Sequence, residues 1–231
     1  MIELLSQWNI ELSDNQINQF DKYYHFLVSW NEKMNLTAIT ELDDVILKHF
    51  VDSTALLRYV DLSDKTLLDV GTGAGFPGVV LKILCPSCRV TLLDSLNKRI
   101  VFLNELIKEL SLSDIKAVHG RAEDFAHVKF HRESYDFVTS RAVANLSVLS
   151  EYCVPFVSTG GMFVPYKSGN IDEELEGCKN ALSLLNCTCD MVEKFSLPGS
   201  DLERSLVFIK KNKSTPKQYP RKAGTPSKSP L

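Results

Sequence analysis

The residues best suited to bind a ligand lie in a glycine-rich turn at positions 69 to 78. The turn reads Asp-Val-Gly-Thr-Gly-Ala-Gly-Phe-Pro-Gly and directly follows an apolar run. Its alternate glycines let the backbone turn sharply and approach a ligand closely, and the free N–H groups that open the next helix can meet a carboxylate or a phosphate. The spacing G-x-G-x-G departs from the dinucleotide fingerprint G-x-G-x-x-G, because Phe76 stands where the last glycine would be. The turn therefore predicts a nucleotide cofactor without choosing which one.

A second candidate ligand group is Asp94, which ends the next strand-like run, 21 residues after Gly73. An acid at the carboxyl end of a neighbouring strand can accept hydrogen bonds from two ribose hydroxyls. In isolation such an Asp is more often a solvated or capping residue, but the glycine turn upstream favours ribose recognition. NAD and S-adenosylmethionine share this feature, so Asp94 leaves both cofactors open.

Two further loops follow later strand-like runs. In the loop after the third run, Ala122 and Glu123 could meet an adenine edge, and Arg141 lies in the loop Ser140-Arg141-Ala142 after the fourth. Glu123 and Asp124 could instead stabilise a helix N-terminus, and Arg141 could be a surface charge. Their joint position at successive strand ends favours a binding site.

Strands and helices must alternate to bring these loops together. Strands are predicted at 66–70, 89–94, 115–118, 135–139, 161–164 and 205–209, mostly separated by helical stretches. The clearest helix starts at Leu96, with Ile100, Leu103, Ile107 and Leu110 in register. This alternation predicts an α/β fold whose parallel sheet is covered on both faces, with ligands at the carboxyl ends of the strands.

A helical segment precedes this core. Ser13 and Gln16 form a capping-box pattern. One face of the helix that follows would carry Ile17, Phe20, Tyr24, Leu27 and Val28. A second helix is predicted from 43 to about 59, with Ile46, Leu47, Phe50 and Val51 facing inward.

Composition bounds the class of protein. A chain of 231 residues with 44% hydrophobic residues can bury a substantial core, most simply one main domain with an appendage. No apolar run is long enough for a membrane span, and the amino terminus lacks a signal-peptide pattern. We therefore expect a cytoplasmic protein that does not associate with a membrane. The six cysteines show no disulfide framework. Cys85 and Cys88 form one C-x-x-C pair without a matching second pair, so we expect no metal.

The carboxyl-terminal segment is electrostatically distinct. Residues 210–231 contain seven basic residues and no acid, which leaves 19 basic and 29 acidic residues before them. The segment also holds four of the nine prolines, and we expect it to be extended or turn-like and not helical. It is either a solubilising disordered end or a binding segment for a phosphate backbone. If it binds RNA only, deleting residues 213–231 should leave cofactor affinity nearly intact.

Taken together, these motifs resemble the RsmG (GidB) family of bacterial 16S rRNA guanine-N7 methyltransferases. The resemblance covers nearly the whole chain, and its specific part is the glycine turn with Phe76-Pro77-Gly78 combined with the helical preface and the basic tail. The matching segments are 30–37 (WNEKMNLT), 49–53 (HFVDS), 69–78 (DVGTGAGFPG), 93–95 (LDS), 98–99 (KR), 122–123 (AE), 140–142 (SRA), 166–167 (YK) and 219–222 (YPRK). One departure is Ser168, where the family pattern has Gly after the Lys.

The resemblance implies a Rossmann-like class I S-adenosylmethionine-dependent methyltransferase fold with an N-terminal helical extension. It implies a helical extension at 1–60, a methyltransferase domain at 61–211 and a basic, proline-rich tail at 212–231. Cofactor contact is carried over to Gly71, Gly73, Phe76, Asp94, Ala122, Glu123 and Arg141. RNA contact is carried over to Arg141, Lys167, Arg221 and Lys222. The implied partner is 16S rRNA or the small ribosomal subunit, and the implied oligomeric state is a monomer.

The absent motifs agree with guanine N7 as the methyl acceptor. Exocyclic amine methylation uses an Asn/Asp-Pro-Pro-aromatic segment after the fourth strand, and this chain has Thr139-Ser140-Arg141-Ala142 there. Pyrimidine carbon methylation needs a cysteine nucleophile, and Cys153 and Cys189 fall outside the strand-end loops. Guanine N7 carries a lone pair in neutral solution, so no catalytic general base is expected. The alternatives are a methyltransferase for another RNA or a small molecule, an NAD-dependent dehydrogenase and a non-enzymatic RNA-binding protein.

Overall fold

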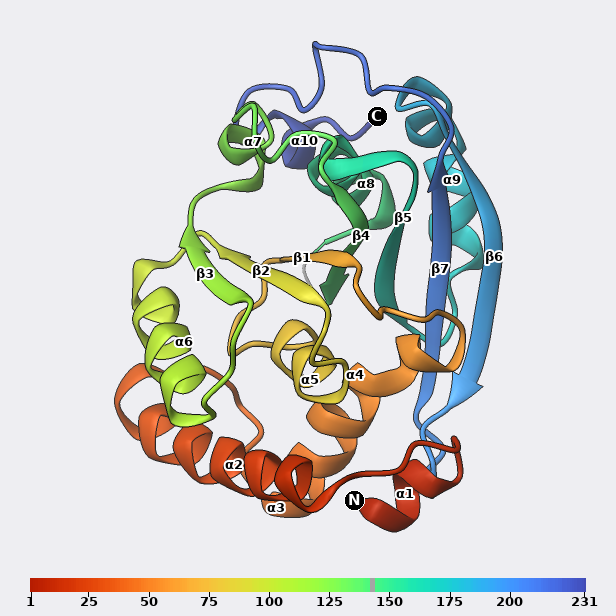
Figure 1. Cartoon of the computed structure of the whole chain (residues 1–231). Helices are drawn as coiled ribbons and strands as arrows, with labels where there is room; N and C mark the ends of the chain where they lie inside the picture. The colour runs from red at the N-terminus through yellow and green to blue at the C-terminus, as the bar shows by residue number, and fades with distance from the viewer. Residues whose placement is uncertain (142–143) are drawn as a thin grey trace.

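A seven-stranded sheet forms the centre of the computed structural model, which describes residues 1–141 and 144–231 (Figure 1). The strands lie in the order β3-β2-β1-β4-β5-β7-β6. They are β1 (Thr66–Val70), β2 (Arg89–Asp94), β3 (Ile115–His119), β4 (Tyr135–Arg141), β5 (Val157–Ser168), β6 (Cys187–Ser196) and β7 (Glu203–Lys211). The first five pair in parallel, while β7 pairs antiparallel with β5 and with β6. The strand order reverses between the adjacent strands β1 and β4, which is where ligands bind in open α/β sheets.

The six predicted strands are confirmed, and β1 and β2 have the predicted bounds. The prediction of a parallel sheet is wrong for β7, and β6 was not predicted. Strand β6 lies at the sheet edge, with most of its side chains exposed or half-buried. Its register also shifts between Cys189 and Met191. A half-solvated edge strand with an irregularity in its register loses the alternation that would reveal it.

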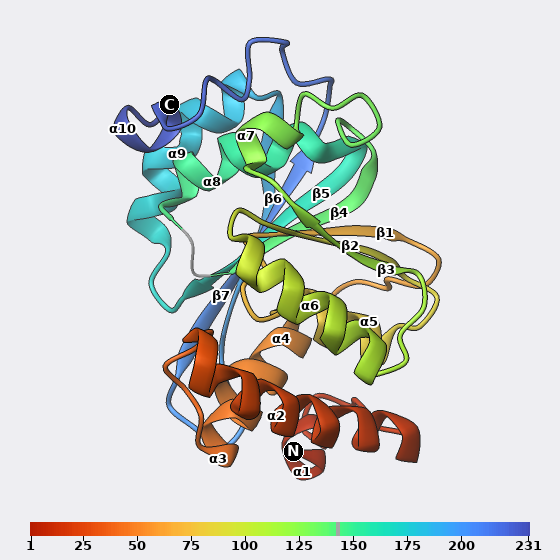
Figure 2. The same cartoon turned by 90° about the vertical axis from the view of Figure 1, so that its left-hand side faces the viewer.

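Helices cover both faces of the sheet, as the alternation predicts (Figure 2). One layer contains α5 (Gly78–Leu84) and α6 (Asn97–Glu109), and the other contains α7 (Ala122–Phe125), α8 (Leu146–Cys153) and α9 (Asp172–Leu184). Each layer buries its own apolar cluster against the sheet. The fold is therefore Rossmann-like, with the ends of β1, β2, β3 and β4 free to form a site.

The N-terminal segment adds a further helical layer below α5 and α6 (Figure 2). It consists of α1 (Ile2–Ser6), α2 (Asp14–Met34), α3 (Leu42–Val45), a π-helical turn (Ile46–Val51), α4 (Asp52–Thr54) and a 3₁₀ turn (Ala55–Arg58). Helix α2 starts at the predicted capping box of Ser13 and Gln16, and it contacts α5 and α6. This segment is thus built onto the core on the side that carries the glycine turn.

The predicted second helix is interrupted by the π-helical turn. The turn buries Phe50 and Val51 as expected, but Ile46 and Leu47 are only half-buried. A π turn adds a residue to the helical repeat and rotates the side chains that follow it, and such turns often lie at functional sites.

The C-terminal segment is folded, which contradicts both the disordered alternative and the expectation that it contains no helix. It carries a short helix, α10 (Thr225–Lys228), with Pro226 in its first turn, where proline costs no hydrogen bond. Tyr219 is only 6% exposed and belongs to the apolar cluster beside α8. The segment lies across the helical layer of α7 and α8, so the two chain termini are on opposite faces of the sheet (Figures 1 and 2).

Candidate active site

Three adjoining clefts lie along the carboxyl ends of the parallel strands. The outer cleft, of about 300 Å³, is lined by Asp94, Ala122, Glu123, Tyr152 and Gly224 among others. The central cleft, of about 380 Å³, includes Gly71, Gly73, Phe76, Asp94, Arg99 and Arg141. The basic cleft, of about 580 Å³, includes Lys48, Asp52, Arg141, Tyr166, Lys167 and Arg204. Asp94 joins the outer cleft to the central one, and Arg141 joins the central cleft to the basic one.

Asp69 stabilises the conformation of the glycine turn through hydrogen bonds. Its fully buried carboxylate accepts hydrogen bonds from the Thr72 hydroxyl at 2.7 Å and from the Gly78 N–H at 2.9 Å. Gly73 has a φ of +62°, a conformation that L side chains rarely adopt. Burial raises the pKa of Asp69 to about 6, although its hydrogen bonds favour the charged form. At neutral pH the carboxylate therefore holds both ends of the turn.

Asp94 is buried at the end of β2 and faces the turn. It accepts hydrogen bonds from the N–H groups of Gly73 and Leu96, each at 2.9 Å. Arg99 of α6 forms an ion pair with it at 3.1 Å. These contacts fix the carboxylate at the junction of the outer and central clefts. The position is suitable for two adjacent ribose hydroxyls, and that role stays a prediction.

The N-terminal extension contributes directly to the central cleft. The buried Tyr23 hydroxyl of α2 donates a 2.6 Å hydrogen bond to the Ala74 carbonyl of the turn. Phe76 stacks between the rings of Tyr23, at a centroid distance of 5.2 Å, and His49, at 4.5 Å. Sequence reasoning missed Tyr23, because an aromatic residue on an amphipathic helix has the pattern of any core residue. The extension therefore positions residues that line the central cleft.

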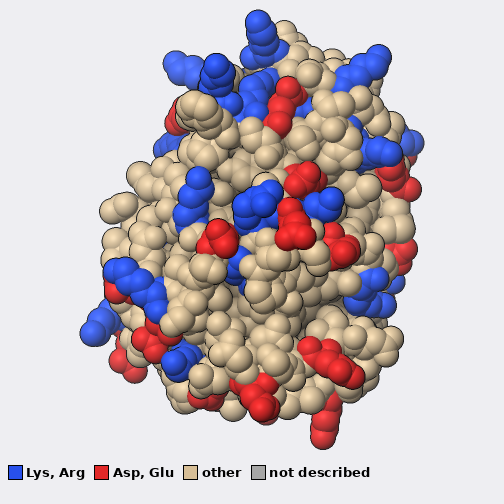
Figure 3. All heavy atoms as spheres, in the orientation of Figure 1, with Lys and Arg blue, Asp and Glu red and all other residues tan. Residues whose placement is uncertain are grey.

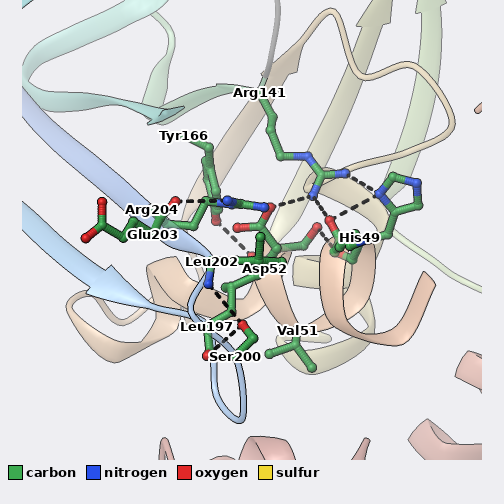
Figure 4. A network of polar contacts seen from close by, with 12 residues as sticks. His49, Val51, Asp52, Arg141, Tyr166, Leu197, Ser200, Leu202, Glu203 and Arg204 are labelled. Atoms are coloured by element: carbon green, nitrogen blue, oxygen red, sulfur yellow. Dashed lines mark hydrogen bonds and ion pairs between the residues drawn. The ribbon is translucent and has the colours of Figure 1, made fainter. Parts of the chain in front are cut away.

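Arg141 lies at the centre of a polar network (Figure 4). Its guanidinium donates to the Lys48 carbonyl at 3.1 Å and to the Asp52 carboxylate at 3.3 Å, and it lies 5.1 Å from the centre of the Phe76 ring. Its side chain is 12% exposed, so the surface-charge alternative is wrong. Ala142, which was considered with it, lies outside the described residues. Arg141 is held where the central and basic clefts meet.

Asp52 connects Arg141 to the antiparallel part of the sheet. Its Oδ2 atom also accepts from Nε of Arg204 at 3.2 Å, and Arg204 comes from β7. Among the described residues, the buried Oδ1 atom has no hydrogen-bond partner. Sequence reasoning noted the HFVDS segment only as part of a resemblance and assigned no role to Asp52 or Arg204. The network joins Asp52 to Arg141, which lies 89 residues later in the chain, and to Arg204, which lies 152 residues later.

His49 faces both the central and the basic cleft. Its Nε2 atom lies 2.9 Å from the Thr37 hydroxyl, and Nδ1 lies 3.2 Å from the Arg141 guanidinium. Burial, together with the positive charge of Arg141, lowers the pKa of His49 to about 4. The imidazole is therefore neutral at physiological pH and is not poised to exchange a proton there.

The remaining predicted residues lie at the two ends of the groove. Lys167 lines the basic cleft, where its ammonium pairs with Glu174 at 2.7 Å and donates to the Ala144 carbonyl at 2.9 Å. Ala122 and Glu123 line the outer cleft, and Glu123 accepts the N–H of Gly224 at 3.1 Å. The structure thus brings all seven predicted cofactor residues and Lys167 into one continuous groove.

The two predicted tail residues behave differently. Arg221 forms a bidentate ion pair with the fully buried Glu151, with contacts of 2.6 to 3.1 Å, and this uses its guanidinium inside the protein. Lys222 is exposed. On the face seen in Figure 3, Lys and Arg gather along the edge formed by the C-terminal segment, while acids are more frequent at the opposite edge over the N-terminal helices. The basic tail therefore has an internal and an external set of charges.

Residues 1–141 and 144–231 contain neither a candidate metal site nor a candidate membrane-spanning helix. No group of three or more His, Cys, Asp and Glu side chains there could hold a metal ion. Burial raises the pKa of Cys85 to about 11 and of Cys88 to about 12, so both thiols stay protonated. In the same described part of the chain, no helix has the length and apolar character needed to cross a membrane.

Comparison with known proteins assigns the family. The model of the GidB family, described as rRNA small subunit methyltransferase G, matches residues 16–207 and ends before the C-terminal segment. A protein named ribosomal RNA small subunit methyltransferase G from Staphylococcus carnosus is 52% identical over an alignment of 233 positions, which covers 100% of this chain and 97% of that protein. A protein of the same name from Bacillus licheniformis is 53% identical over 228 residues, with coverage of 98% and 95%.

A solved structure supports the fold alone. The geranyl diphosphate C-methyltransferase from Streptomyces coelicolor A3(2), determined with S-adenosyl-L-homocysteine, superposes with a TM-score of 0.54. Its sequence identity is 13%, and the match covers 69% of this chain and 78% of that chain. The shared architecture is the helix-covered sheet that carries the groove.

Proposed function

Because the chain belongs to the rRNA small subunit methyltransferase G family, we propose that it transfers a methyl group from S-adenosylmethionine to N7 of a guanine in 16S rRNA. The observation that carries this proposal is the continuity of the groove. A nucleotide-type site around Asp94 and the glycine turn opens at Arg141 into a cleft lined by four cationic side chains, Lys48, Arg141, Lys167 and Arg204. One end fits the cofactor, and the other fits a polyanionic acceptor.

The cofactor would lie along the outer and central clefts. Asp94 would bind the ribose hydroxyls, Ala122 and Glu123 would meet the adenine, and Gly71 and Gly73 would face the methionine part. Phe76, held between Tyr23 and His49, would keep the reacting end of the central cleft dry. S-adenosylmethionine is preferred to NAD as the cofactor, because the chain belongs to a methyltransferase family.

The target guanosine would enter the basic cleft. Arg141 and Lys167 would hold the base and its phosphates, and Arg204 and Lys48 extend the same positive surface. Asp52 keeps Arg141 and Arg204 together, since its Oδ2 atom accepts from both. Arg141 can therefore orient the acceptor without rotating away from the methyl donor.

The chemistry would be a direct displacement at the sulfonium methyl carbon. The N7 lone pair forms the new N–C bond while the S–C bond breaks and its electron pair returns to sulfur. The positive charge moves from the sulfonium to the guanine, and no proton is transferred at this step. Positioning can supply on the order of 7 to 11 kcal/mol for ideally oriented reactants, which is the role assigned to this chain's residues.

The methyl-transfer step should show no titrating limb between about pH 7 and 9. His49 is the imidazole nearest the reaction, and its pKa of about 4 keeps it neutral throughout this range. Asp69, with a pKa of about 6, gains a proton only on the acid side. Single-turnover rates on saturated enzyme and rRNA will test this. A tenfold rise per pH unit that vanishes on substituting one of His25, His49, His119, His127 or His131 would contradict the mechanism.

The exposed tail lysines should contribute to RNA affinity through phosphate contacts. Lys213, Lys217, Lys222 and Lys228 are exposed, so changing them to Gln leaves the internal ion pairs intact. Each lost phosphate contact should reduce the slope of log affinity against log salt by roughly 0.7 to 0.9. Binding to 30S particles measured over a salt series checks this, with Lys179→Gln on the exposed face of α9 as the control. An unchanged slope in the tail variant would exclude these contacts.

The assay that tests the whole proposal uses labelled S-adenosylmethionine and ribosomal particles that lack the modification. We expect 7-methylguanosine in digests of 16S rRNA, and comparison of naked rRNA, 30S particles and 70S ribosomes identifies the substrate form. A methyl group on another atom, another RNA or a small molecule would support the alternative methyltransferase. Binding of NAD in place of S-adenosylmethionine would overturn the cofactor assignment.

The cellular setting and the organisation of the chain are part of the same proposal. Since its proposed substrate is ribosomal RNA, we expect the protein to be a cytoplasmic monomer that does not associate with a membrane. We assign residues 1–60 to the helical extension, 61–211 to the methyltransferase domain and 212–231 to the basic tail.

A further inference from the structure

We propose that the C-terminal tail, residues 212–231, is part of the cofactor site. In this assignment Gly224 and Ser227, together with Tyr152 of α8, form the wall against which the adenine of S-adenosylmethionine lies. The inference rests on the proposed function, because it takes the outer cleft as the adenine end of the groove. It replaces the expectation that the tail can be deleted without affecting cofactor affinity.

The tail is anchored beside the outer cleft by buried polar contacts. Glu151 is fully buried in α8, and it receives the backbone N–H of Arg221 at 2.7 Å in addition to the guanidinium. A second anchor is Arg132, which donates to the carbonyls of Tyr219 at 2.9 Å and Thr215 at 3.0 Å. Removing one partner of such buried contacts leaves the other unsatisfied. These contacts fix the position of the tail, so its inner side can form one wall of the outer cleft.

The tail contacts Glu123, the residue predicted to bind the adenine. Gly224 has a φ of +80°, and its N–H donates to Oε1 of Glu123 at 3.1 Å. Glu123 is 9% exposed, so this contact sets the direction of its carboxylate. With Oε1 engaged, Oε2 is the oxygen available to accept from the exocyclic amine of adenine. The tail would therefore orient Glu123 as well as cover the base.

Ser227 and Tyr152 continue the same wall. The Tyr152 hydroxyl donates to the Ser227 hydroxyl at 3.4 Å, and both residues line the outer cleft with Asp94 and Glu123. Asp94 at the ribose position and Glu123 at the base position define the direction of the bound nucleoside. The adenine then lies between the β3 loop and the tail, on the side of the groove away from the basic cleft.

Ser227→Phe tests the wall with little risk to the fold, since Ser227 is exposed and its side chain supports only weak contacts. The added ring should fill the outer cleft and weaken S-adenosylhomocysteine binding about tenfold or more, measured by calorimetry. The matched control is Ser229→Phe, two residues on, whose exposed side chain does not line the cleft. 5′-Methylthioadenosine, which keeps the adenine and ribose but lacks the amino-acid part, should lose affinity by a similar factor.

Hydrogen exchange gives a readout that needs no substitution. Adding S-adenosylhomocysteine to the full chain should slow exchange in the peptide that contains residues 222–229. Unchanged exchange there, together with unaltered affinity of Ser227→Phe, would overturn the tail's role while leaving the function intact. Failure of the unmodified protein to bind S-adenosylhomocysteine at all would instead overturn the proposed function.

Discussion

Replacing Arg221 with Ala should lower the free energy of unfolding by about 3 kcal/mol, because it leaves the Glu151 carboxylate buried without its counter-charge. The Glu151 side chain is 0% exposed, while that of Arg221 is 26% exposed. Water can therefore reach the vacated position, and this places the loss at the lower end of the range for broken buried pairs. Urea unfolding followed by circular dichroism measures the change.

Two further variants identify the cause. Glu151→Gln combined with Arg221→Ala should recover part of the loss, since a neutral amide is less costly to bury than a carboxylate. Lys222→Ala removes an exposed neighbouring charge and should leave stability within about 0.5 kcal/mol. Equal stability of Arg221→Ala and Lys222→Ala would show that the pair does not hold the tail.

This pair also shows why the sequence left two alternatives open for the tail and did not predict that it folds onto the protein. Composition reveals that the last 22 residues are basic and rich in proline, and that pattern is typical of both disordered and RNA-binding segments. It does not reveal a buried acid 70 residues earlier in the chain. One long-range ion pair changes the interpretation of Arg221 from an external charge to an internal one.

The outer and central clefts could be predicted because their signals are local. The glycine spacing, the strand before it and Asp94 at the next strand end all depend on neighbouring residues in sequence. The parallel strands then bring the successive strand ends to one edge of the sheet. Such residues can be identified from the sequence without knowing which distant residues they pack against.

The basic cleft could be predicted only in part, because its geometry depends on tertiary contacts. Arg141 was expected at a strand end, but its partners Asp52 and His49 come from a helix that the sequence pattern describes as regular. The π-helical turn directs the Lys48 carbonyl and His49 toward Arg141. Hydrophobic periodicity carries no signal for a single widened turn, so the network is visible only in the structure.

Asp94→Ala should weaken S-adenosylhomocysteine binding by about 10- to 150-fold, which corresponds to the 1.5 to 3 kcal/mol of hydrogen bonds to a charged group. The variant removes the acceptor for the ribose and also leaves Gly73 N–H and Arg99 without their partner. Asp94→Asn keeps one carbonyl oxygen and should fall between the parent and Asp94→Ala. Asp201→Ala, an exposed acid away from the groove, should bind as the parent does.

A ligand change separates the lost ribose contact from a shifted turn. If Asp94 binds the ribose hydroxyls, 2′-deoxy-S-adenosylhomocysteine should bind the parent more weakly, and the same modification should cost much less in Asp94→Ala. Two changes that remove one interaction are not additive, and their coupling energy measures that interaction. Full additivity would mean that Asp94 acts only by holding Gly73 and the turn. Equal affinity of Asp94→Ala and the parent would place the cofactor elsewhere, since no other acid lines the junction of the outer and central clefts among the described residues.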